Sequence, residues 1–304
     1  MKTPTSRLYS STADLHAMLG LLIAVRHAER IADYPGAVDL RELLALPVVQ
    51  DNTRLWFDAA DRLVGFALVD HYNNLCFEFG DPGIEAEIVD WGVQCIRRAI
   101  QATGEALTLD ASCSADNTGR RALLERHGFI QEAMRSVHMT RSLHGPFPVP
   151  QIPAGFSIRH VAGEHEVEAL VALHRAAFGT ENMTLEERLA MMRVPDYDAE
   201  LDLVAVAPAG QLAAYCMCSI SREENARTGR NEGYTDPVAT HPDFQRRGLA
   251  KALLLMGLRT LQQRGIDTAC LGTSSDNVAM QRTAQAAGFR VQSTTLWFSK
   301  PVSL

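Results

Sequence analysis

The residues best suited to chemistry lie in Gly233–Ala250, where a predicted strand and a predicted helix are joined by a tight loop. Tyr234–Thr240 is rich in β-branched and aromatic residues, which favours a strand. His241–Asp243 is a turn signal, and apolar residues recur at helical spacing from there to Gly265. The stretch therefore predicts a strand, a loop and the start of a helix.

The loop of this stretch is suited to an anion. The first backbone N–H groups of a helix lack internal partners and carry partial positive charge. Gly248 has no Cβ and Ala250 is small, so a diphosphate could approach the backbone closely. Arg246, Arg247 and Lys251 add positive charge around the loop. An ordinary helix start with solvated arginines is the alternative interpretation.

The sequence Gln-Arg-Arg-Gly-Leu-Ala at residues 245–250 resembles the Arg/Gln-x-x-Gly-x-Gly/Ala signature of GCN5-related N-acetyltransferases, the GNAT superfamily. The strand before it and the segment Asn277–Phe289 after it make the resemblance specific. In that family the loop holds the pyrophosphate of acetyl-coenzyme A. The phosphate loop of nucleoside triphosphatases and the Gly-x-Gly-x-x-Gly loop of Rossmann proteins do not occur at this junction.

Length and composition bound the class of protein. The chain has 304 residues, of which 46% are hydrophobic and 21% charged, as in a globular protein of two domains. Its net charge of −7 gives no basic footprint for nucleic acid. The apolar run Met18–Val25 is too short to span a membrane. We therefore expect a cytoplasmic protein with neither nucleic-acid nor membrane partners; its oligomeric state is not readable.

The six cysteines form no Cys-x-x-Cys pair and no Cys/His spacing typical of zinc, so we expect no metal site. They are Cys76, Cys95, Cys113, Cys216, Cys218 and Cys270. This usage is typical of reduced, mostly buried thiols in a cytosolic protein. Cys216 and Cys218 would face one side of a strand, where core packing is favoured over catalysis.

A proline-rich segment divides the chain. His144–Pro153 carries four prolines, so it cannot form a helix and is expected to be a semi-extended linker. We place one domain at residues 1–145, the linker at 146–153 and a second domain at 154–304.

The two halves carry an internal repeat. Five residues of the first half recur 160 positions later: Ser114, Asp116, Asn117, Gly128 and Phe129 match Ser274, Asp276, Asn277, Gly288 and Phe289. Such a match at one fixed offset favours two copies of one fold. The chain thus resembles tandem GNAT proteins of the mycothiol synthase type. This resemblance implies an α/β (α+β) protein with two domains, each a mixed, mostly antiparallel sheet flanked by helices.

The halves are not equivalent at the loop. The first half has the acidic segment Phe79–Glu87 in that place, and no Arg or Lys lies between Gly80 and Trp91. Asp81, Glu85 and Glu87 would repel a diphosphate. Unless another loop supplies positive charge, we expect the first domain to bind acetyl-coenzyme A weakly or not at all. It would support the second domain and shape its substrate cleft.

The resemblance implies an acetyl-coenzyme A site in the second half. The strand end would pair with the pantetheine amides, the loop would hold the diphosphate, and an asparagine at a helix start would bond the pantetheine arm. The implied cofactor-binding residues are Val238, Ala239, Thr240, Gln245, Arg246, Arg247, Gly248, Leu249, Ala250, Lys251 and Asn277. For Asn277, a plain N-cap is an equal alternative.

Acetyl transfer to an amine needs a proton acceptor for the amine and a hydrogen-bond donor for the thioester carbonyl. Members of the family usually use a Glu or Asp near the central strand as the base. Asp236 is our first candidate and Glu232 the second. A turn or cap role before Pro237 is the alternative for Asp236.

The usual acid of the family is missing. It is a Tyr seven residues after the asparagine, and this chain has Ala284 there. Tyr234 and Tyr215 are possible substitutes. Two functions therefore stay open: an enzyme that acetylates an amine of a small molecule or peptide, and a non-catalytic acetyl-coenzyme A-binding or sensor module. The intact loop supports both, and Ala284 favours the second.

Overall fold

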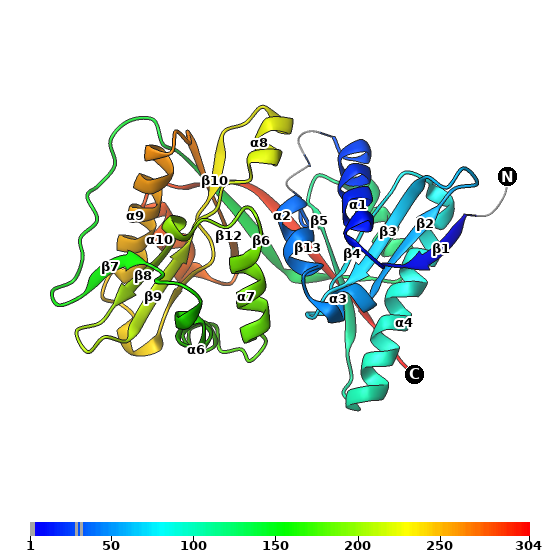
Figure 1. Ribbon diagram of the computed structural model, residues 1–304, viewed down its shortest axis with the longest axis horizontal. Coiled ribbons are helices and arrows are strands. Elements are labelled where there is room, and N and C mark those ends of the chain that lie inside the picture. The colour runs from blue at the N-terminus through cyan, green and yellow to red at the C-terminus, as the bar shows by residue number, and fades with distance from the viewer. Residues whose placement is uncertain (1–3, 28–29, 31–32) are drawn as a thin grey trace. The chain divides into compact units, whose positions relative to one another are not determined.

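The computed structural model describes residues 4–27, 30 and 33–304. The chain forms two compact units, the first from residues 1–135 and 295–304 and the second from residues 136–294 (Figure 1). The unit limits fall within two long strands, β6 (Ile130–Ser142) and β13 (Arg290–Pro301). The first unit therefore includes the end of the chain. The domain limits expected from the sequence, 1–145 and 154–304, do not assign residues 295–304 to the first unit or residues 136–145 to the second. These limits remain a prediction.

The first unit is built on a four-stranded antiparallel sheet in the order β1-β2-β3-β4. Helices α1 and α4 both pack on β3 and β4. A further strand, β5, pairs antiparallel with residues 295–301 of β13. The elements are β1 (Thr5–Leu8), α1 (Thr12–Val25), α2 (Ala37–Leu43), α3 (Pro47–Asp51), β2 (Thr53–Phe57), β3 (Leu63–Val69), β4 (Leu75–Phe79), α4 (Glu85–Thr103), β5 (Thr108–Ser114) and α5 (Thr118–Arg126).

The second unit has a four-stranded antiparallel sheet in the order β11-β9-β8-β7. Beside it, β12 pairs parallel with β10 and antiparallel with residues 136–142 of β6. The elements are β7 (Ser157–His160), α6 (Val167–Phe178), α7 (Leu185–Arg193), β8 (Asp202–Val206), β9 (Leu212–Met217), α8 (Arg222–Thr228), β10 (Glu232–Tyr234), β11 (Val238–Thr240), α9 (Leu249–Gln263), β12 (Thr268–Ser274) and α10 (Val278–Ala286).

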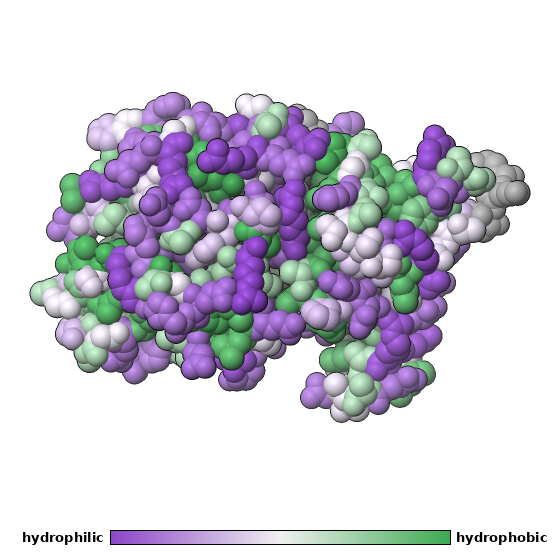
Figure 2. All heavy atoms as spheres, viewed as in Figure 1, coloured by the Kyte–Doolittle hydropathy of each residue, from purple (hydrophilic) through white to green (hydrophobic). Residues whose placement is uncertain are grey.

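Helices α6 and α9 cover opposite faces of the β11-β9-β8-β7 sheet (Figure 1). Because successive strand residues point to opposite faces, Tyr215 packs with Leu170 and Leu173 of α6, whereas Cys216 packs in the cluster of Leu253 and other α9 residues. On the face drawn in Figure 2, hydrophilic residues cover most of the second unit, with hydrophobic residues in scattered patches. None of the described helices is long and apolar enough to cross a membrane.

The repeat predicted from the sequence is present in the structure. Strand β5 and helix α5 of the first unit recur as β12 and α10 of the second, each displaced by 160 residues. Both helices are capped in the same way, because Asn117 Oδ1 accepts from Arg120 N and Asn277 Oδ1 accepts from Met280 N, each at 3.0 Å. The predicted fold class, two tandem units of mixed, mostly antiparallel sheets flanked by helices, is confirmed.

One element was predicted wrongly. Tyr234–Thr240 is not one strand but two, β10 and β11, separated by residues 235–237. Pro237 has no N–H to donate to a ladder, and its peptide bond with Asp236 is cis. Helix α8, which precedes β10, was not predicted.

Candidate functional site

The segment between β10 and β11 is where two ladders separate. Thr235 continues the β10 path, because its backbone N and its Oγ1 both donate to the Cys270 carbonyl of β12, at 2.9 and 3.0 Å. Two residues later the chain has joined the other sheet, since the Pro237 carbonyl accepts from Met217 N of β9 at 3.1 Å. Asp236 therefore lies where the strands diverge.

Strand β11 is the edge of its sheet and leaves backbone groups exposed to a ligand. Pro237 and His241 bond to β9, and Ala239 lies opposite Tyr215 in the register. In an antiparallel ladder the alternate residues face away from the partner, so the backbone groups of Val238 and Thr240 face the open edge. An extended ligand with amide groups could pair there as an added strand.

The loop after β11 presents its backbone to an anion. Arg246 and Gly248 adopt positive φ angles of 61° and 87°, on either side of Arg247. Alternating backbone conformations of this kind turn successive N–H groups towards one concave surface. The first N–H groups of α9, from Leu249 onward, add to it. A Cβ at Gly248 would meet open space, so glycine is required there by the backbone angle and not by a neighbouring atom.

The charged side chains around this loop are not neutralised by the protein. Arg246, Arg247 and Lys251 are exposed, and no carboxylate of the described residues lies within ion-pair distance of them. Arg247 instead lies 5.7 Å from the ring centroid of Phe244 and donates to the Asp243 carbonyl at 3.3 Å. The loop is therefore a backbone cradle surrounded by available positive charge.

Other residues implied by the resemblance have more local roles in the structure. The Leu249 side chain is 1% exposed in the core, so only its backbone could reach a ligand. Gln245 Nε2 donates to the Thr240 carbonyl at 3.4 Å, and Ala250 follows as a small residue of the first turn of α9. Asn277 is the N-cap of α10 through its Oδ1, which leaves its amide Nδ2 without a partner among the described residues.

The three candidate catalytic residues follow one another along one extended segment. Glu232, Tyr234 and Asp236 alternate with inward-facing Gly233 and Thr235, so they share one side. Glu232 lies four residues from Asp236, about 13 Å along a strand, and forms a 3.6 Å ion pair with Arg230. Asp236 has one buried carboxylate oxygen, and the other lies 3.2 Å from where a Cβ on Gly272 would be. Of the two carboxylates, only Asp236 lies at the divergence.

Position 284 does not face a cleft. Ala284 is fully buried in the core cluster that contains residues of α9 and of the sheets. Leu124, at the matching position of the first unit, is fully buried in the core of that unit. A tyrosine at this position would have to displace core side chains. Ala284 itself has no group that could donate a proton.

The buried cysteines of this region are held as thiols. A hydrogen bond with Cys218 and burial raise the pKa of Cys216 well above its ordinary value. Burial, with the Glu232 and Asp236 carboxylates, raises the pKa of Cys270. No group of three or more His, Cys, Asp or Glu side chains that could hold a metal ion occurs in the described part of the chain.

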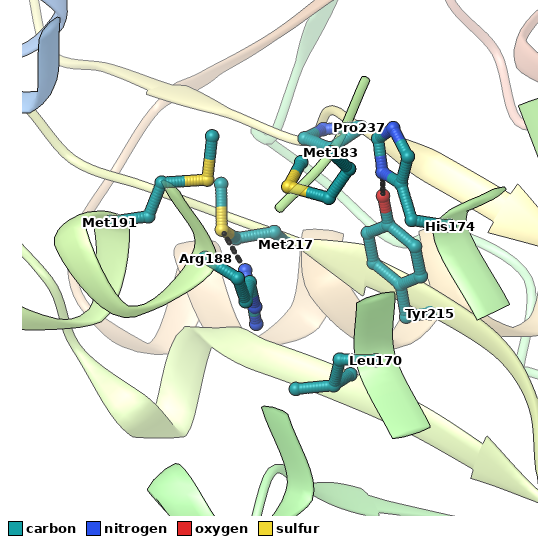
Figure 3. A pocket seen from close by; sticks show the side chains of 8 residues that line it. All are labelled: Leu170, His174, Met183, Arg188, Met191, Tyr215, Met217 and Pro237. Atoms are coloured by element: carbon teal, nitrogen blue, oxygen red, sulfur yellow. Dashed lines mark hydrogen bonds between the residues drawn. The ribbon is translucent and has the colours of Figure 1, made fainter. Parts of the chain in front are cut away.

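A second cluster of polar side chains lies on the α6 face of the same sheet (Figure 3). His174 Nδ1 and the Tyr215 hydroxyl are 2.7 Å apart, and both line a cavity of about 10 Å³ together with Pro237. The other lining residues are Leu170, Met183, Arg188, Met191 and Met217. Tyr215 was named from the sequence as a possible acid, but nothing in the sequence indicated its contact with His174.

Arg188 is the charged member of this cavity. It is 5% exposed, donates to Met217 Sδ at 3.0 Å and forms an ion pair with Asp202, which is fully buried. Tyr197 also donates to Asp202, at 2.9 Å, yet burial still raises the pKa of that carboxyl. The pair fixes α7 to β8, and the sequence contained no signal for it.

The first unit has a larger cavity, about 440 Å³, between β4, β5 and α5. Its arginines are paired within the protein: Arg26 and Arg120 with Glu78, Arg30 with Asp33 and Asp116, and Arg126 with Glu85. Arg120 also donates to the Phe77 carbonyl of β4 at 3.0 Å. These arginines, which could otherwise bind an anion, therefore already have protein partners.

Known proteins of similar sequence are acetyltransferases. Residues 167–289 match the sequence model of the acetyltransferase (GNAT) family. A mycothiol acetyltransferase of Clavibacter michiganensis subsp. michiganensis is 30% identical over 69% of this chain and 70% of that protein. That of Sanguibacter keddieii is 25% identical over 96% and 94%. That of Saccharomonospora viridis is 26% identical, but the alignment spans only 62% of its length.

Solved structures agree at the level of fold. A GCN5-related N-acetyltransferase from Sphaerobacter thermophilus has a TM-score of 0.70 at 22% identity, covering 99% of this chain and 96% of its own. A tandem GNAT protein from the clavulanic acid biosynthesis pathway has a TM-score of 0.69 at 18% identity, covering 99% of both chains. The resemblance read from residues 245–250 and from the repeat is thereby confirmed. The chain belongs to the acetyltransferase (GNAT) family, and its fold is that of tandem GNAT proteins.

Proposed function

We propose that the second unit binds acetyl-coenzyme A and transfers its acetyl group to an amine of a small molecule or peptide. The observation that carries this proposal is the cradle at the start of α9. Positive φ at Arg246 and Gly248 opens its backbone, and Arg246, Arg247 and Lys251 have no carboxylate partner among the described residues. A diphosphate satisfies both features at once, because helix N-termini and unpaired cations favour negative charge.

The edge of β11 continues this site towards the reacting atoms. A pantetheine arm has two amide groups, and the outward backbone of Val238 and Thr240 offers matching donors and acceptors. An arm laid along β11 from the loop would end near Pro237 and Asp236, where the two ladders separate. Asp236 is then the carboxylate that serves the attacking amine, with Glu232 second and Tyr234 as a possible acid. Asn277 would contact the pantetheine arm through Nδ2.

The names of the relatives support a small-molecule acceptor. Eight relatives aligned with this chain are named mycothiol acetyltransferases. Because identities lie between 25% and 32%, the acceptor pocket can differ even where the cofactor loop is retained. We therefore propose the class of acceptor, an amine of a small molecule or peptide, and not the individual compound.

The free cysteines support a cytoplasmic setting. All six are free thiols, five of them buried, and no disulfide joins them. Reduced thiols of this kind are the rule in compartments kept reducing by small-molecule thiols.

The proposal is tested by thiol release. The full chain with acetyl-coenzyme A and a panel of primary amines should release free coenzyme A faster than it does without amine. Calorimetry should show one acetyl-coenzyme A bound for each chain. Binding without thiol release for any amine would support the alternative, a non-catalytic acetyl-coenzyme A-binding module. Absence of binding would contradict both functions.

A further inference from the structure

The His174–Tyr215 pair has the features of a proton-transfer site. The imidazole Nδ1 lies 2.7 Å from the Tyr215 hydroxyl, which fixes the plane of the ring. Phe178, one turn along α6, packs against the imidazole with ring centroids 4.5 Å apart. The other ring nitrogen, Nε2, makes no hydrogen bond to any residue in the described ranges. A histidine held by one nitrogen and open at the other is suited to exchange a proton there.

The pair also lies beside the place where the strands diverge. His174, Tyr215 and Pro237 line the same cavity, and Figure 3 shows the imidazole with one nitrogen directed at the Tyr215 hydroxyl and Pro237 drawn beside the ring. Pro237 directly follows Asp236, and Tyr215 is the register partner of Ala239 on β11. The cavity volume of about 10 Å³ is near what one water molecule needs. The imidazole is thus next to the segment along which the proposed cofactor would end.

We propose that His174 is the base that takes the proton of the acceptor amine, and that Tyr215 is the positioning residue that holds its imidazole in the required tautomer. The proposal rests on the acetyltransferase function proposed above for the same unit. In this proposal two residues have separate roles where β10 and β11 diverge. Asp236 attracts and orients the ammonium form of the acceptor, and His174 removes its proton directly or through one water.

The surroundings keep His174 neutral near pH 7. Burial lowers its pKa below the ordinary 6.5, and the Arg188 guanidinium lowers it further, whereas the Glu187 carboxylate opposes them. Tyr215 of β9 is the other titratable group that faces the ring, and β11 contributes none, since its residues are Val238, Ala239 and Thr240. An imidazole that is neutral before the reaction can accept a proton.

The protons and bonds balance with no further reactant. With Nδ1–H donating to the Tyr215 oxygen, Nε2 carries the lone pair and takes one proton from the ammonium group. The amine lone pair then forms the C–N bond at the thioester carbonyl, and the C–S bond breaks as the tetrahedral centre collapses. The nitrogen loses its second proton, which ends on the leaving sulfur to give a free thiol. The proton on Nε2 returns to solvent before the next turnover.

A purely structural role is the competing interpretation, since a buried His–Tyr hydrogen bond could only fasten α6 to β9. Three variants separate the two. His174→Gln keeps a polar side chain of similar length but cannot take a proton, and Tyr215→Phe removes only the hydroxyl. His165→Gln changes an exposed histidine of the same unit and serves as the matched control.

With the amine that gives the fastest wild-type turnover, we expect His174→Gln to lower kcat by about a hundredfold. Its affinity for acetyl-coenzyme A should stay within twofold of the wild-type value. The wild-type kcat should fall at acid pH as His174 becomes protonated, and His174→Gln should lack this fall. Tyr215→Phe should keep the fall, move its midpoint and lower kcat by about three- to tenfold. His165→Gln should match wild type throughout.

The outcomes separate this inference from the proposed function. If wild type turns over and His174→Gln keeps both its kcat and the acid fall, His174 is not the base, while the acetyltransferase function stands. If His174→Gln loses activity together with acetyl-coenzyme A binding or thermal stability, and Tyr215→Phe leaves the pH profile unchanged, the pair is structural and the proposal is wrong. Wild-type protein that binds acetyl-coenzyme A but acetylates no amine overturns the function, and the base assignment falls with it.

Discussion

The two units carry the same repeat but differ at the entrance to the long central helix. The loop before α4 is residues 80–84, whereas the loop before α9 is residues 241–248, three residues longer. In the short loop, the Asp81 carboxylate accepts from Gly83 N at 2.8 Å and so occupies one of the backbone donors. In the long loop, positive φ at Arg246 and Gly248 leaves the donors facing outward. One fold can therefore keep or lose an anion site by a short change of loop.

The difference in charge is one of pairing more than of number. The first unit also has arginines near its cavity, but Glu78 binds two of them and Glu85 binds Arg126. Arg120 replaces Met280 in the repeat, and its guanidinium lies 4.1 Å from the Phe77 ring centroid. These arginines stabilise the unit, and a ligand would have to displace their carboxylates. The cations of the second unit's loop have no such competitors among the described residues.

Variants of one carboxylate in each unit test the difference between the two units most strongly. Asp236→Asn removes the negative charge at the divergence, so we expect the rate to fall by roughly a hundredfold. Acetyl-coenzyme A affinity should stay nearly unchanged, because the carboxylate lies beyond the diphosphate loop. Asp81→Asn in the first unit should leave the rate intact. An unaffected Asp236→Asn rate would remove Asp236 from the mechanism and direct attention to Glu232.

The loop itself is tested by bulk and charge at its glycine. Gly248→Glu adds a carboxylate at the cradle and strains a backbone held at φ 87°, so acetyl-coenzyme A should bind at least tenfold more weakly, on the order of 1.4 kcal/mol. Gly248→Ala has the same backbone strain without the charge, so its affinity should lie between those of wild type and Gly248→Glu. Gly80→Glu in the first unit should change nothing. Calorimetry that finds two equal acetyl-coenzyme A sites would contradict the difference between the units. So would a first-unit variant that binds acetyl-coenzyme A as weakly as Gly248→Glu does.

A single unpaired cation should have a smaller effect. Lys251 lies in the first turn of α9 and is exposed, so Lys251→Ala keeps a good helix former and loses only charge. A cation near the bound diphosphate contributes up to about 1 kcal/mol, so we expect about a fivefold loss of affinity at low ionic strength. The loss should shrink as salt rises, because exposed charges are screened. Arg121→Ala on α5 removes an arginine already paired with Glu125 and should have no effect at any salt concentration.

Local sequence signals were sufficient for the parts of the site that one segment builds. The loop at 245–250 and the caps at Asn117 and Asn277 depend on neighbouring residues, so their chemistry can be read from spacing alone. The repeat made the fold predictable, because two copies at one offset report the same helix and strand. The cofactor and catalytic roles assigned to these residues remain predictions.

What the sequence did not reveal depends on contacts between distant segments. In the run Tyr234–Thr240, Pro237 indicates an interrupted ladder, but nothing local indicates that the two ends pair with different neighbours. The sequence showed that Ala284 replaces the usual Tyr of the family, but not that the packing of α10 places this residue in the core. The His174–Tyr215 contact joins residues 41 apart on a helix and a strand. Each is a property of the tertiary arrangement, which propensity does not encode.

The finest test uses the matched asparagines of the repeat. Asn117 and Asn277 make the same cap hydrogen bond, so replacing either by Ala should destabilise its unit by a similar amount, about 1 kcal/mol, measured by denaturant unfolding. Only the Nδ2 of Asn277 is proposed to reach the pantetheine arm. Asn277→Ala should therefore also lower the affinity for acetyl-coenzyme A by about threefold, whereas Asn117→Ala should leave this affinity unchanged.

Serine at these positions separates the cap from the ligand contact. Its hydroxyl is as good an N-cap acceptor as asparagine, but it has no amide donor in the place of Nδ2. If Asn277 binds the pantetheine arm, Asn277→Ser restores the stability lost in Asn277→Ala but not the affinity. If Asn277 is only a cap, Asn277→Ser binds acetyl-coenzyme A as wild type does, and both asparagines of the repeat are then structural alone. Asn117→Ser should match wild type in stability and affinity, because the first unit would offer its asparagine no ligand.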